Sequence, residues 1–220
     1  DFCLSRGLGD VYKRQPQYIA DFYKEKDCDV ETNVGPNGVK VTIDSGKPGK
    51  TIAIRADFDA LPIEEQTGLS FASKNKGVMH ACGHDAHTAY MLILGETLIE
   101  MKEQFKGKVV IIHQPAEEIP PGGAQGMIKD GVLEGVDHVL GAHVMSTMEA
   151  GKVFYKEGYV QTGRAYFKLV VQGKGGHGSS PHMANDAIVA GSNFVTIAQT
   201  VVSRRLNPFE TGVVLSLIHI

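Results

Sequence analysis

Cysteine is scarce in this sequence, and long apolar runs are missing. Its 220 residues include three cysteines, Cys3, Cys28 and Cys82. An odd, sparse set of thiols does not suit a disulfide framework, so we expect a reducing, cytoplasmic location. Apolar runs such as residues 109–112 are far too short to span a bilayer, and no signal peptide can be recognised at the start. We therefore expect no membrane partner.

Blocks of like charge are also missing. The chain has 22 basic and 25 acidic residues and a net charge of −3. Nucleic-acid-binding domains gather Lys and Arg into a basic patch, and no such block stands out here, so we expect no nucleic-acid partner. The 42% of hydrophobic residues are enough for a buried core and too many for a disordered chain.

The two ends look foreign to the rest of the sequence. Residues 10–15 and 215–220 can be encoded by GATGTGTATAAGAGACAG and by its reverse complement, and this DNA resembles the transposon end used in sequencing-library adapters. We therefore expect residues 1–15 and 215–220 to be non-native junction sequence around a native part, 16–214, that is truncated at both ends. The alternative is a pair of ordinary frayed termini.

Predicted strands and helices alternate through the first two thirds of the chain. This alternation is typical of an α/β fold with a mainly parallel sheet. The continuous apolar run 108–113 indicates a strand at the centre of the sheet, covered on both faces. The predicted strands are 39–43, 51–56, 108–113 and a buried one at 136–144, and the predicted helices are 17–26, 86–104 and 124–129.

The character of the sequence changes near Gly158. A predicted strand at 165–172 leads into a glycine-rich turn at 173–178 and a helix at 185–203. We therefore expect residues 16–157 to belong to one domain and residues 158–214 to begin a second, smaller α+β domain.

Polar clusters gather at one edge of the predicted sheet. Residues 55–62, 114–118 and 141–143 close or follow strands, and residues 80–85 precede the long helix. Ligands of open α/β sheets bind at the carboxyl ends of the strands. A thiol, an imidazole and a carboxylate are natural ligands of Zn²⁺, Mn²⁺ or Co²⁺. The sequence therefore predicts a metal site at this edge.

Each member of the cluster has an ordinary explanation when it is taken alone. Cys82 alone is most simply a buried structural thiol, and His143 a partly buried histidine at a strand end. Glu117 and Glu118 are harder to explain, since a charged pair directly after an apolar strand is costly without partners. The combination is a stronger signal than any of its members.

The segments that carry this chemistry resemble the amidohydrolase branch of the M20 metallopeptidase family, over essentially all of residues 16–214. That branch includes hippurate hydrolases, N-acyl-amino-acid amidohydrolases and hydrolases of auxin–amino-acid conjugates. The resemblance implies a catalytic α/β domain with two divalent metal ions (Mn²⁺, Zn²⁺ or Co²⁺), interrupted by a lid domain that often forms a homodimer. It also implies hydrolysis of the amide bond of N-acylated amino acids. The matching segments, in family order, are RADFDALP, MHACGHDAHT, HQPAEE, GGA, GAH and GKGGHGSSPH.

The resemblance also implies a role for each matching residue. Asp57 stands where other branches have a ligand histidine, so we expect a cysteine to substitute for it, and we expect Asp57 and Asp59 to orient the ligands from behind. His80 and His87 flank the ligand motif, and a supporting role in the site and a packing role remain equally open. The implied metal ligands are Cys82, His84, Glu118 and His143, with Glu117 as the general base.

The implied chemistry is a hydrolysis with divided roles. Two metal ions would share a water and lower its pKa, while Glu117 would take its proton and pass it to the leaving amine. His177 matches a lid histidine that steadies the oxyanion, commonly in the partner subunit, and His182 is a candidate contact for the substrate carboxylate. The family has a further histidine ligand after the lid, outside this chain, so we expect residues 1–220 to be inactive alone.

Two other functions are also compatible with parts of the sequence. Gly173, Gly175 and Gly178 form a G-x-G-x-x-G pattern after a predicted strand, which is typical of a nucleotide-dependent oxidoreductase. Pro181 separates this turn from its helix, and no acidic residue follows about 20 positions on, which argues against it. The second alternative is a non-catalytic metal-binding or dimerisation module. Cofactor absorbance, metal content and hydrolysis of N-acyl amino acids distinguish the three.

Overall fold

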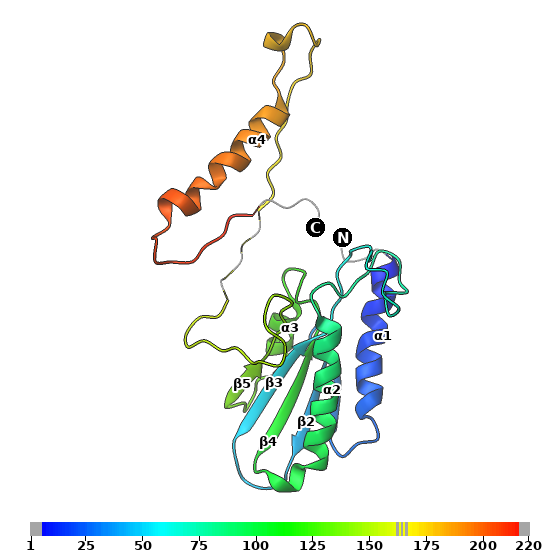
Figure 1. Cartoon of the computed structure of the whole chain (residues 1–220). Coiled ribbons are helices and arrows are strands. Elements are labelled where there is room, and N and C mark those ends of the chain that lie inside the picture. Colours follow the sequence, from blue (N-terminus) through cyan, green and yellow to red (C-terminus); the bar gives the residue numbers. More distant parts are fainter. Residues whose placement is uncertain (1–5, 162, 164, 166, 216–220) are drawn as a thin grey trace. The chain divides into compact units, whose positions relative to one another are not determined.

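The computed structural model describes residues 6–161, 163, 165 and 167–215. The chain forms two compact units, of which the first ends at Met148 and the second begins at Glu149 (Figure 1). This boundary lies a few residues before the change in sequence character near Gly158. Among the described residues, no helix is both long enough and apolar enough to cross a membrane.

A five-stranded sheet in the order β1-β2-β4-β3-β5 is the frame of the first unit. β3 pairs in parallel with both β4 and β5, whereas β2 pairs antiparallel with β4 and with β1. The α/β class is confirmed and β4 lies at the centre as predicted, while the sheet as a whole is mixed, with its parallel strands at one end of the order. The strands are β1 Asp29–Val34, β2 Gly38–Asp44, β3 Thr51–Asp57, β4 Lys108–Gln114 and β5 His138–Gly141.

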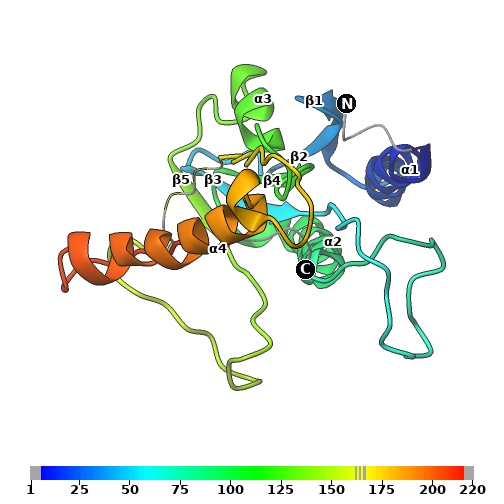
Figure 2. The same ribbon diagram turned by 90° about the horizontal axis from the view of Figure 1, so that it is seen from above.

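Helices cover both faces of this sheet (Figure 2). Side chains alternate between the two faces of a strand, so Val109 and Ile111 of β4 join one buried cluster and Val110 and Ile112 join the other. The first cluster packs against α1 and α2, and the second against α3. Each fully buried aliphatic side chain contributes about 1.5–3 kcal/mol. The helices are α1 Arg6–Tyr23, α2 His84–Glu100 with a short 3-10 turn η2 Lys102–Gln104 after it, and α3 Gly123–Lys129.

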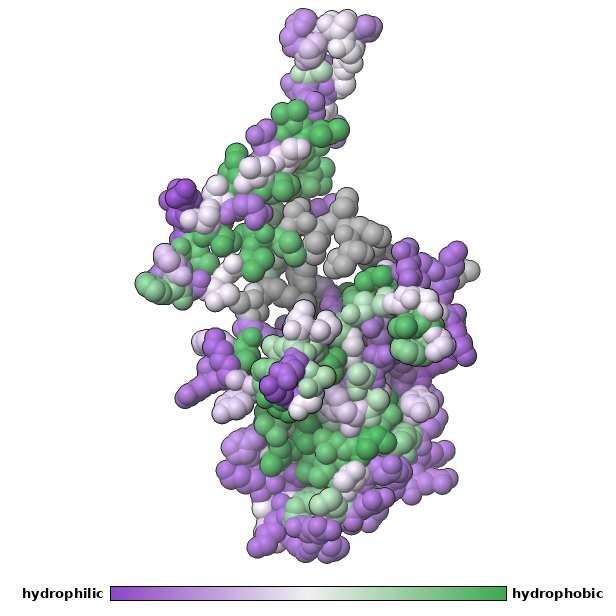
Figure 3. Space-filling model, in the orientation of Figure 1, coloured by the Kyte–Doolittle hydropathy of each residue, from purple (hydrophilic) through white to green (hydrophobic). Residues whose placement is uncertain are grey.

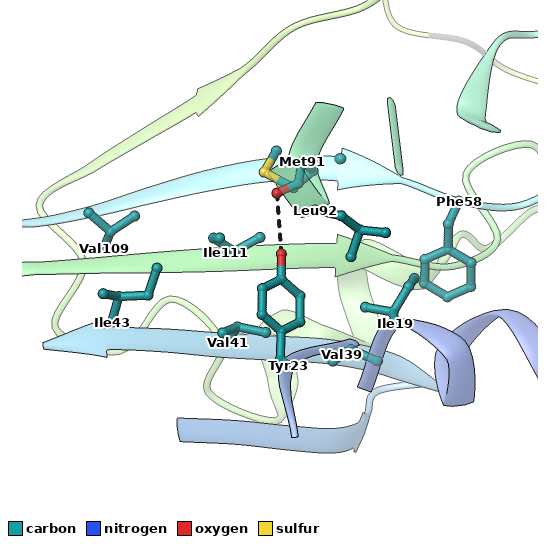
Figure 4. Close-up of a cluster of buried hydrophobic side chains, with 11 residues drawn as sticks. Ile19, Tyr23, Val39, Val41, Ile43, Phe58, Met91, Leu92, Val109 and Ile111 are labelled. Carbon is teal, nitrogen blue, oxygen red and sulfur yellow. Dashed lines mark hydrogen bonds between the residues drawn. The ribbon is translucent and has the colours of Figure 1, made fainter. Parts of the chain in front are cut away.

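Tyr23 joins α1 to α2 inside the larger cluster (Figure 4). Its side chain is fully buried, and its hydroxyl donates a 3.2 Å hydrogen bond to the carbonyl of Met91 in α2. A buried hydroxyl needs such a partner, so this hydrogen bond fixes how α1 and α2 are oriented where their apolar side chains meet. It holds α2 over the sheet and thereby fixes the helix whose first turn carries the candidate site.

Two strands of the first unit differ from the prediction. The predicted buried strand 136–144 is shorter, and all four residues of β5 are exposed, because β5 ends the sheet and no further strand pairs with it among the described residues. β1 was not predicted, because its six residues are mostly polar. The alternation of Val30, Thr32 and Val34 just before the turn at 35–37 was the signal that would have revealed it.

The predicted strand at 165–172 is not formed by the residues that the structure describes there. A strand needs a hydrogen-bonded neighbour, and this segment packs on a helix instead, with the rings of Phe167 and Phe194 6.2 Å apart. The predicted helix 185–203 is confirmed in its main part. The elements of the second unit are η3 Pro181–Met183, α4 Ala187–Ala198 and the π-helical turn η4 Val201–Arg205.

Hydrophobic side chains gather on the surface of α4 (Figure 3). Ile188, Val189 and Ile197 are all more than half exposed. A helix that leaves so much apolar surface in water is typical of an element that has a further packing partner.

Candidate metal centre

Three parallel strands deliver polar residues to one edge of the sheet. β3 ends at Asp57 and is followed by Asp59, β4 leads to Glu117 and Glu118, and β5 leads to His143. Because β3 pairs in parallel with both β4 and β5, their carboxyl ends meet at the same edge, where ligands of such sheets bind.

The N-terminus of α2 supplies the remaining residues. Gly83 precedes the helix with a φ of +84°, a left-handed conformation that suits glycine. A Cβ atom at this position would lie 2.5 Å from Cγ2 of Val144. The missing side chain therefore lets the loop after β5 pack closely against the motif, and this brings Cys82 and His84 beside His143.

His84 is buried and presents one ring nitrogen to this space. Its Nδ1 lies 3.2 Å from Oδ1 of Asp59, and because a carboxylate only accepts, Nδ1 carries the proton. Its Nε2 has no hydrogen-bond partner and lies 3.6 Å from Oδ1 of Asp57 and 3.9 Å from Oε1 of Glu118. Burial alone would lower the pKa of His84, but the bond to Asp59 and the surrounding carboxylates raise it.

Asp59 connects the ligand histidine to the glutamate pair. Besides His84, its carboxylate accepts the backbone N–H of Glu118 at 3.1 Å and that of Glu117. Burial would raise the pKa of Asp59, but these hydrogen bonds lower it, so the group stays ionised. The turn itself begins at Ala116, whose φ of +50° is unusual for a residue with a Cβ. One carboxylate thus fixes both sides of the site.

His143 and Cys82 are in contact at the exposed side of the cluster. Nδ1 of His143 donates to the carbonyl of Val144 at 2.6 Å, and its Nε2 lies 3.4 Å from Sγ of Cys82. Burial, a hydrogen bond with Glu118 and the charges of neighbouring carboxylates raise the pKa of Cys82 to about 12. A cation bound beside the sulfur would be needed to hold it as the thiolate that ligates metals.

The donor set fits a divalent cation. Ligand atoms of Cys82, His84 and His143 lie within 4.8 Å of one another, and so do those of His84, Glu117 and Glu118. The two groups share His84, whose buried Nε2 has no other partner, and a dication would offset the negative charge of the carboxylates around it. The structure brings all four predicted ligands and the predicted base together, and their individual roles stay predictions.

Sequence reasoning left the role of His87 open, and the structure places this residue, fully buried, behind the site. Its Nδ1 lies 2.5 Å from Oδ1 of Asp57, and its Nε2 accepts the N–H of Val144 at 2.9 Å. Arg55, also not predicted, pairs with Oδ2 of Asp57 at 2.7 Å. The spacing of three residues between His84 and His87, which puts both on one helix face, was the signal that could have found this layer.

His177 and His182 belong to the second unit, so their part in the site stays a prediction. His177 accepts the N–H of Ser179 on Nδ1 at 3.3 Å, and the Ser179 hydroxyl lies 2.8 Å from the same nitrogen. Nε2 therefore carries the proton and can act as a donor. His182 is exposed within η3.

The mixed α/β sheet and this Cys/His/Glu cluster at its edge define a metallopeptidase-like protein. Residues 53–208 match the model of peptidase family M20/M25/M40, and the chain belongs to this family. Among its relatives, the N-acyl-L-amino acid amidohydrolase of Geobacillus stearothermophilus is 46% identical over 164 residues, which cover 74% of this chain and 44% of that protein. The N-acetyl-L-cysteine deacetylase of Bacillus subtilis (strain 168) is 42% identical over 196 residues, which cover 89% of this chain and 47% of that protein.

Solved structures agree with this assignment. One from methicillin-resistant Staphylococcus aureus is 80% identical, with a TM-score of 0.77, and the match covers 91% of this chain and 53% of that chain. The Bacillus subtilis YxeP protein, a dinuclear metal binding peptidase from the M20 family, is 41% identical with a TM-score of 0.62, and the match covers 66% of this chain and 41% of that chain. The resemblance predicted from the motifs is confirmed. The chain spans about half the length of the curated relatives it matches.

The glycine-rich turn does not form a dinucleotide site. α4 begins only at Ala187, well after Gly178, and Asp186 caps it by accepting the N–H groups of Ile188 and Val189 at 2.8 and 3.1 Å. A pyrophosphate would need these helix N-terminal amides for itself, and the carboxylate both occupies them and repels an anion. The oxidoreductase alternative is therefore set aside.

Proposed function

We propose that the protein hydrolyses the amide bond of N-acylated amino acids, with two divalent ions held by Cys82, His84, Glu118 and His143. One observation carries the proposal: His84 and His143 both use Nδ1 to donate to an oxygen, which leaves the two Nε2 atoms facing Glu118 and Cys82 respectively. The ions, when bound, would supply Lewis-acid activation of a water and of the amide carbonyl. The relatives that are an N-acyl-L-amino acid amidohydrolase and an N-acetyl-L-cysteine deacetylase support the substrate class.

The identity of the ions follows from the donor types. A thiolate with imidazoles suits Zn²⁺, and the carboxylates suit Mn²⁺. The structure of YxeP, a dinuclear metal binding relative, supports a count of two. We propose Zn²⁺ or Mn²⁺, with Co²⁺ as a workable substitute.

Glu117 and Glu118 have different tasks in this proposal. Oε1 of Glu118 lies 3.9 Å from Nε2 of His84, on the side where the ion would sit. Glu117 takes the proton of the attacking water and returns it to the leaving amine. Because Asp59 accepts both backbone N–H groups, the ligand and the base keep a fixed spacing.

The second unit contributes substrate contacts in this proposal. We assign 16–157 to the catalytic domain and 158–214 to the start of a lid that forms a cytoplasmic homodimer. His177, with its proton on Nε2, would donate to the oxyanion of the tetrahedral intermediate. His182 would contact the substrate carboxylate.

Hydrolysis of N-acetyl and N-benzoyl amino acids, with metal analysis, tests the proposal. The protein would be expressed from its complete open reading frame, stripped with a chelator and reloaded with Mn²⁺, Zn²⁺ or Co²⁺. We expect activity to disappear on chelation and to return with metal. Bound metal without hydrolysis of any N-acyl amino acid would favour the non-catalytic module instead.

A further inference from the structure

His87 is bonded through both ring nitrogens, which determines its protonation. The N–H of Val144 can only donate, so Nε2 of His87 is the acceptor, and Nδ1 carries the proton that it donates to Asp57. Asp57, His84 and His87 lie close enough together to suggest a metal group. However, His87 in this arrangement has no lone pair left for an ion, so its task must be another one.

The bond to Val144 acts on the peptide that links Val144 to His143. The ring of His143 is exposed, and its Nδ1 bonds to the carbonyl of Val144 in the same short loop. The loop has no regular structure of its own, so its position depends on contacts from outside. His143 can hold an ion only if this loop stays in place.

The outside contacts of this loop come from the start of α2. Gly83 packs against Val144, the hydroxyl of Tyr90 donates to the carbonyl of Ala142 at 2.9 Å, and His87 accepts the Val144 N–H between them. Of these two hydrogen bonds, the one to His87 is partly buried and the one from Tyr90 is exposed, and a hydrogen bond costs more to lose where water cannot replace it. On the opposite side of the His87 ring, Asp57 accepts from Nδ1 and is itself paired with Arg55.

We propose that His87 is a positioning residue, which keeps His143 in place for the metal by accepting the Val144 N–H. The inference rests on the proposed function in taking His143 as a ligand, and its cobalt measurement also takes Cys82 as one. Residues that orient a metal ligand typically change metal affinity about 10- to 100-fold when they are replaced.

Two substitutions separate the two bonds of His87. His87→Gln can place an amide oxygen near the position of Nε2 and so retains an acceptor for Val144, whereas His87→Asn reaches only the position of Nδ1 and retains the contact with Asp57. The measurement is the Co²⁺ affinity of the protein expressed from its complete open reading frame, followed by the thiolate-to-cobalt absorption of Cys82 without substrate. We expect His87→Asn to weaken Co²⁺ binding about 10- to 100-fold and His87→Gln to weaken it much less.

Each other pattern overturns the inference. If His87→Gln weakens Co²⁺ binding more than His87→Asn does, the effect of His87 depends on its bond to Asp57. If both variants weaken Co²⁺ binding equally, or neither does, the bond to Val144 does not position His143. His138→Gln, which changes an exposed histidine at the start of β5, is the matched control and should leave Co²⁺ affinity unchanged. If His87→Asn does not fold, His87→Ser carries the test, since it also has no acceptor at the position of Nε2 for the Val144 N–H. An unchanged Co²⁺ affinity in that variant would then contradict the proposal.

A double-mutant cycle distinguishes the positioning of His143 from a general structural role of His87. In a His143→Ala background, His87→Asn should have no further effect on Co²⁺ affinity, because the ligand that it positions is already gone. An undiminished effect would show that His87 acts elsewhere. In turnover, His87→Asn should lower kcat more than it raises KM. If the wild type binds Co²⁺ but hydrolyses no N-acyl amino acid, the proposed function fails while the cobalt data still decide on His87.

Discussion

At the scale of single residues, the arrangement of the cluster depends on hydrogen bonds that decide which ring nitrogen of each histidine is left without a proton. Asp59 and the Val144 carbonyl fix the protons of His84 and His143 on Nδ1, and Val144 N–H fixes that of His87 on the same atom. All three rings thus have an unprotonated Nε2, and its surroundings differ: it lies near Glu118 in His84, near Cys82 in His143, and accepts the Val144 N–H in His87.

Glu117→Gln separates metal binding from catalysis. The amide cannot take a proton, while the implied ligands Cys82, His84, Glu118 and His143 are untouched, so we expect bound metal to remain and turnover to fall by about 10²–10⁴-fold, the usual contribution of a general base. Metal analysis and steady-state kinetics on the same preparation check this. A near-normal rate would show that Glu117 is not the base.

Asp59→Asn should produce the opposite result. The isosteric amide removes the charge that holds the His84 proton on Nδ1 and offers one oxygen fewer to the N–H groups of Glu117 and Glu118. We expect metal affinity to fall about 10- to 100-fold, with turnover restored at saturating metal. Competition with a chromophoric chelator measures the affinity, and full affinity in the variant would contradict the role of Asp59.

The residue types of this site, with Asp57 and Asp59 behind it, were predictable from the sequence, whereas the hydrogen-bond partners of His87 were not. Cys82, His84 and the two glutamates stand in local motifs of chain-adjacent residues. The bonds of His87 to Asp57 and Val144 join residues 30 and 57 positions apart. No local pattern encodes such pairings, since they form only when α2 docks on the sheet.

At the scale of elements, the first turn of α2 and the loop after β5 work as one piece. The absent Cβ of Gly83, rather than a bond, allows their approach. Gly83→Ala would add both a clash with Val144 and the strain of a φ of +84°, about 1–2 kcal/mol for a residue with a Cβ.

We therefore expect Gly83→Ala to weaken metal binding by displacing His143. The free energy of unfolding of the metal-free protein should fall by less than the free energy of metal binding. Calorimetric titration with Zn²⁺ and thermal unfolding of the metal-free protein measure the two effects. Gly46→Ala is a suitable control, because Gly46 also has a positive φ but no atom within 4 Å of an added Cβ. If Gly83→Ala and Gly46→Ala have the same metal affinity, the close packing of Gly83 against Val144 does not position His143.

β4 carries a buried group that makes the fold sensitive to acid. Neither ring nitrogen of His113 has a hydrogen-bond partner, and burial lowers its pKa from 6.5 to about 3. Between these values the unfolded chain binds a proton that the folded protein excludes. Stability is therefore lost as the pH falls below about 6.5, with a slope approaching about 1.4 kcal/mol per pH unit for this group.

His113→Phe removes this proton and keeps a ring beside Tyr23, 5.9 Å away in the wild type. We expect the free energy of unfolding of the wild type to fall faster than that of the variant between pH 6.5 and pH 4. Urea unfolding at several pH values gives both curves. Parallel curves would mean that His113 is not the group responsible.

The elements whose formation or burial depends on tertiary contacts were the hardest to predict. The apolar run of β4 is a local signal, and it was found. β5 was predicted as buried because its residues are apolar, yet no strand lies on its outer side among the described residues. The segment 165–172 likewise has residues typical of a strand, but the described part of the chain offers it no strand with which to pair.

At the scale of the whole molecule, the chain covers about half the length of its curated relatives. The family resemblance implies one more histidine ligand beyond this length. We expect purified residues 1–220 to show no amidohydrolase activity above background and the product of the complete open reading frame to be active. Identical assays with added Mn²⁺ and Zn²⁺ compare the two, and measurable turnover by 1–220 would contradict the expectation.

The exposed β5 has a consequence for handling the protein. Val139 and Leu140 are each more than half exposed on a strand with only one neighbour in the described sheet. Bare strand edges with apolar side chains recruit strands from other molecules. In a concentrated solution of residues 1–220 we therefore expect molecules to aggregate through the edge of β5. The solubility of the folded chain, rather than its activity, would then limit the amount that can be purified.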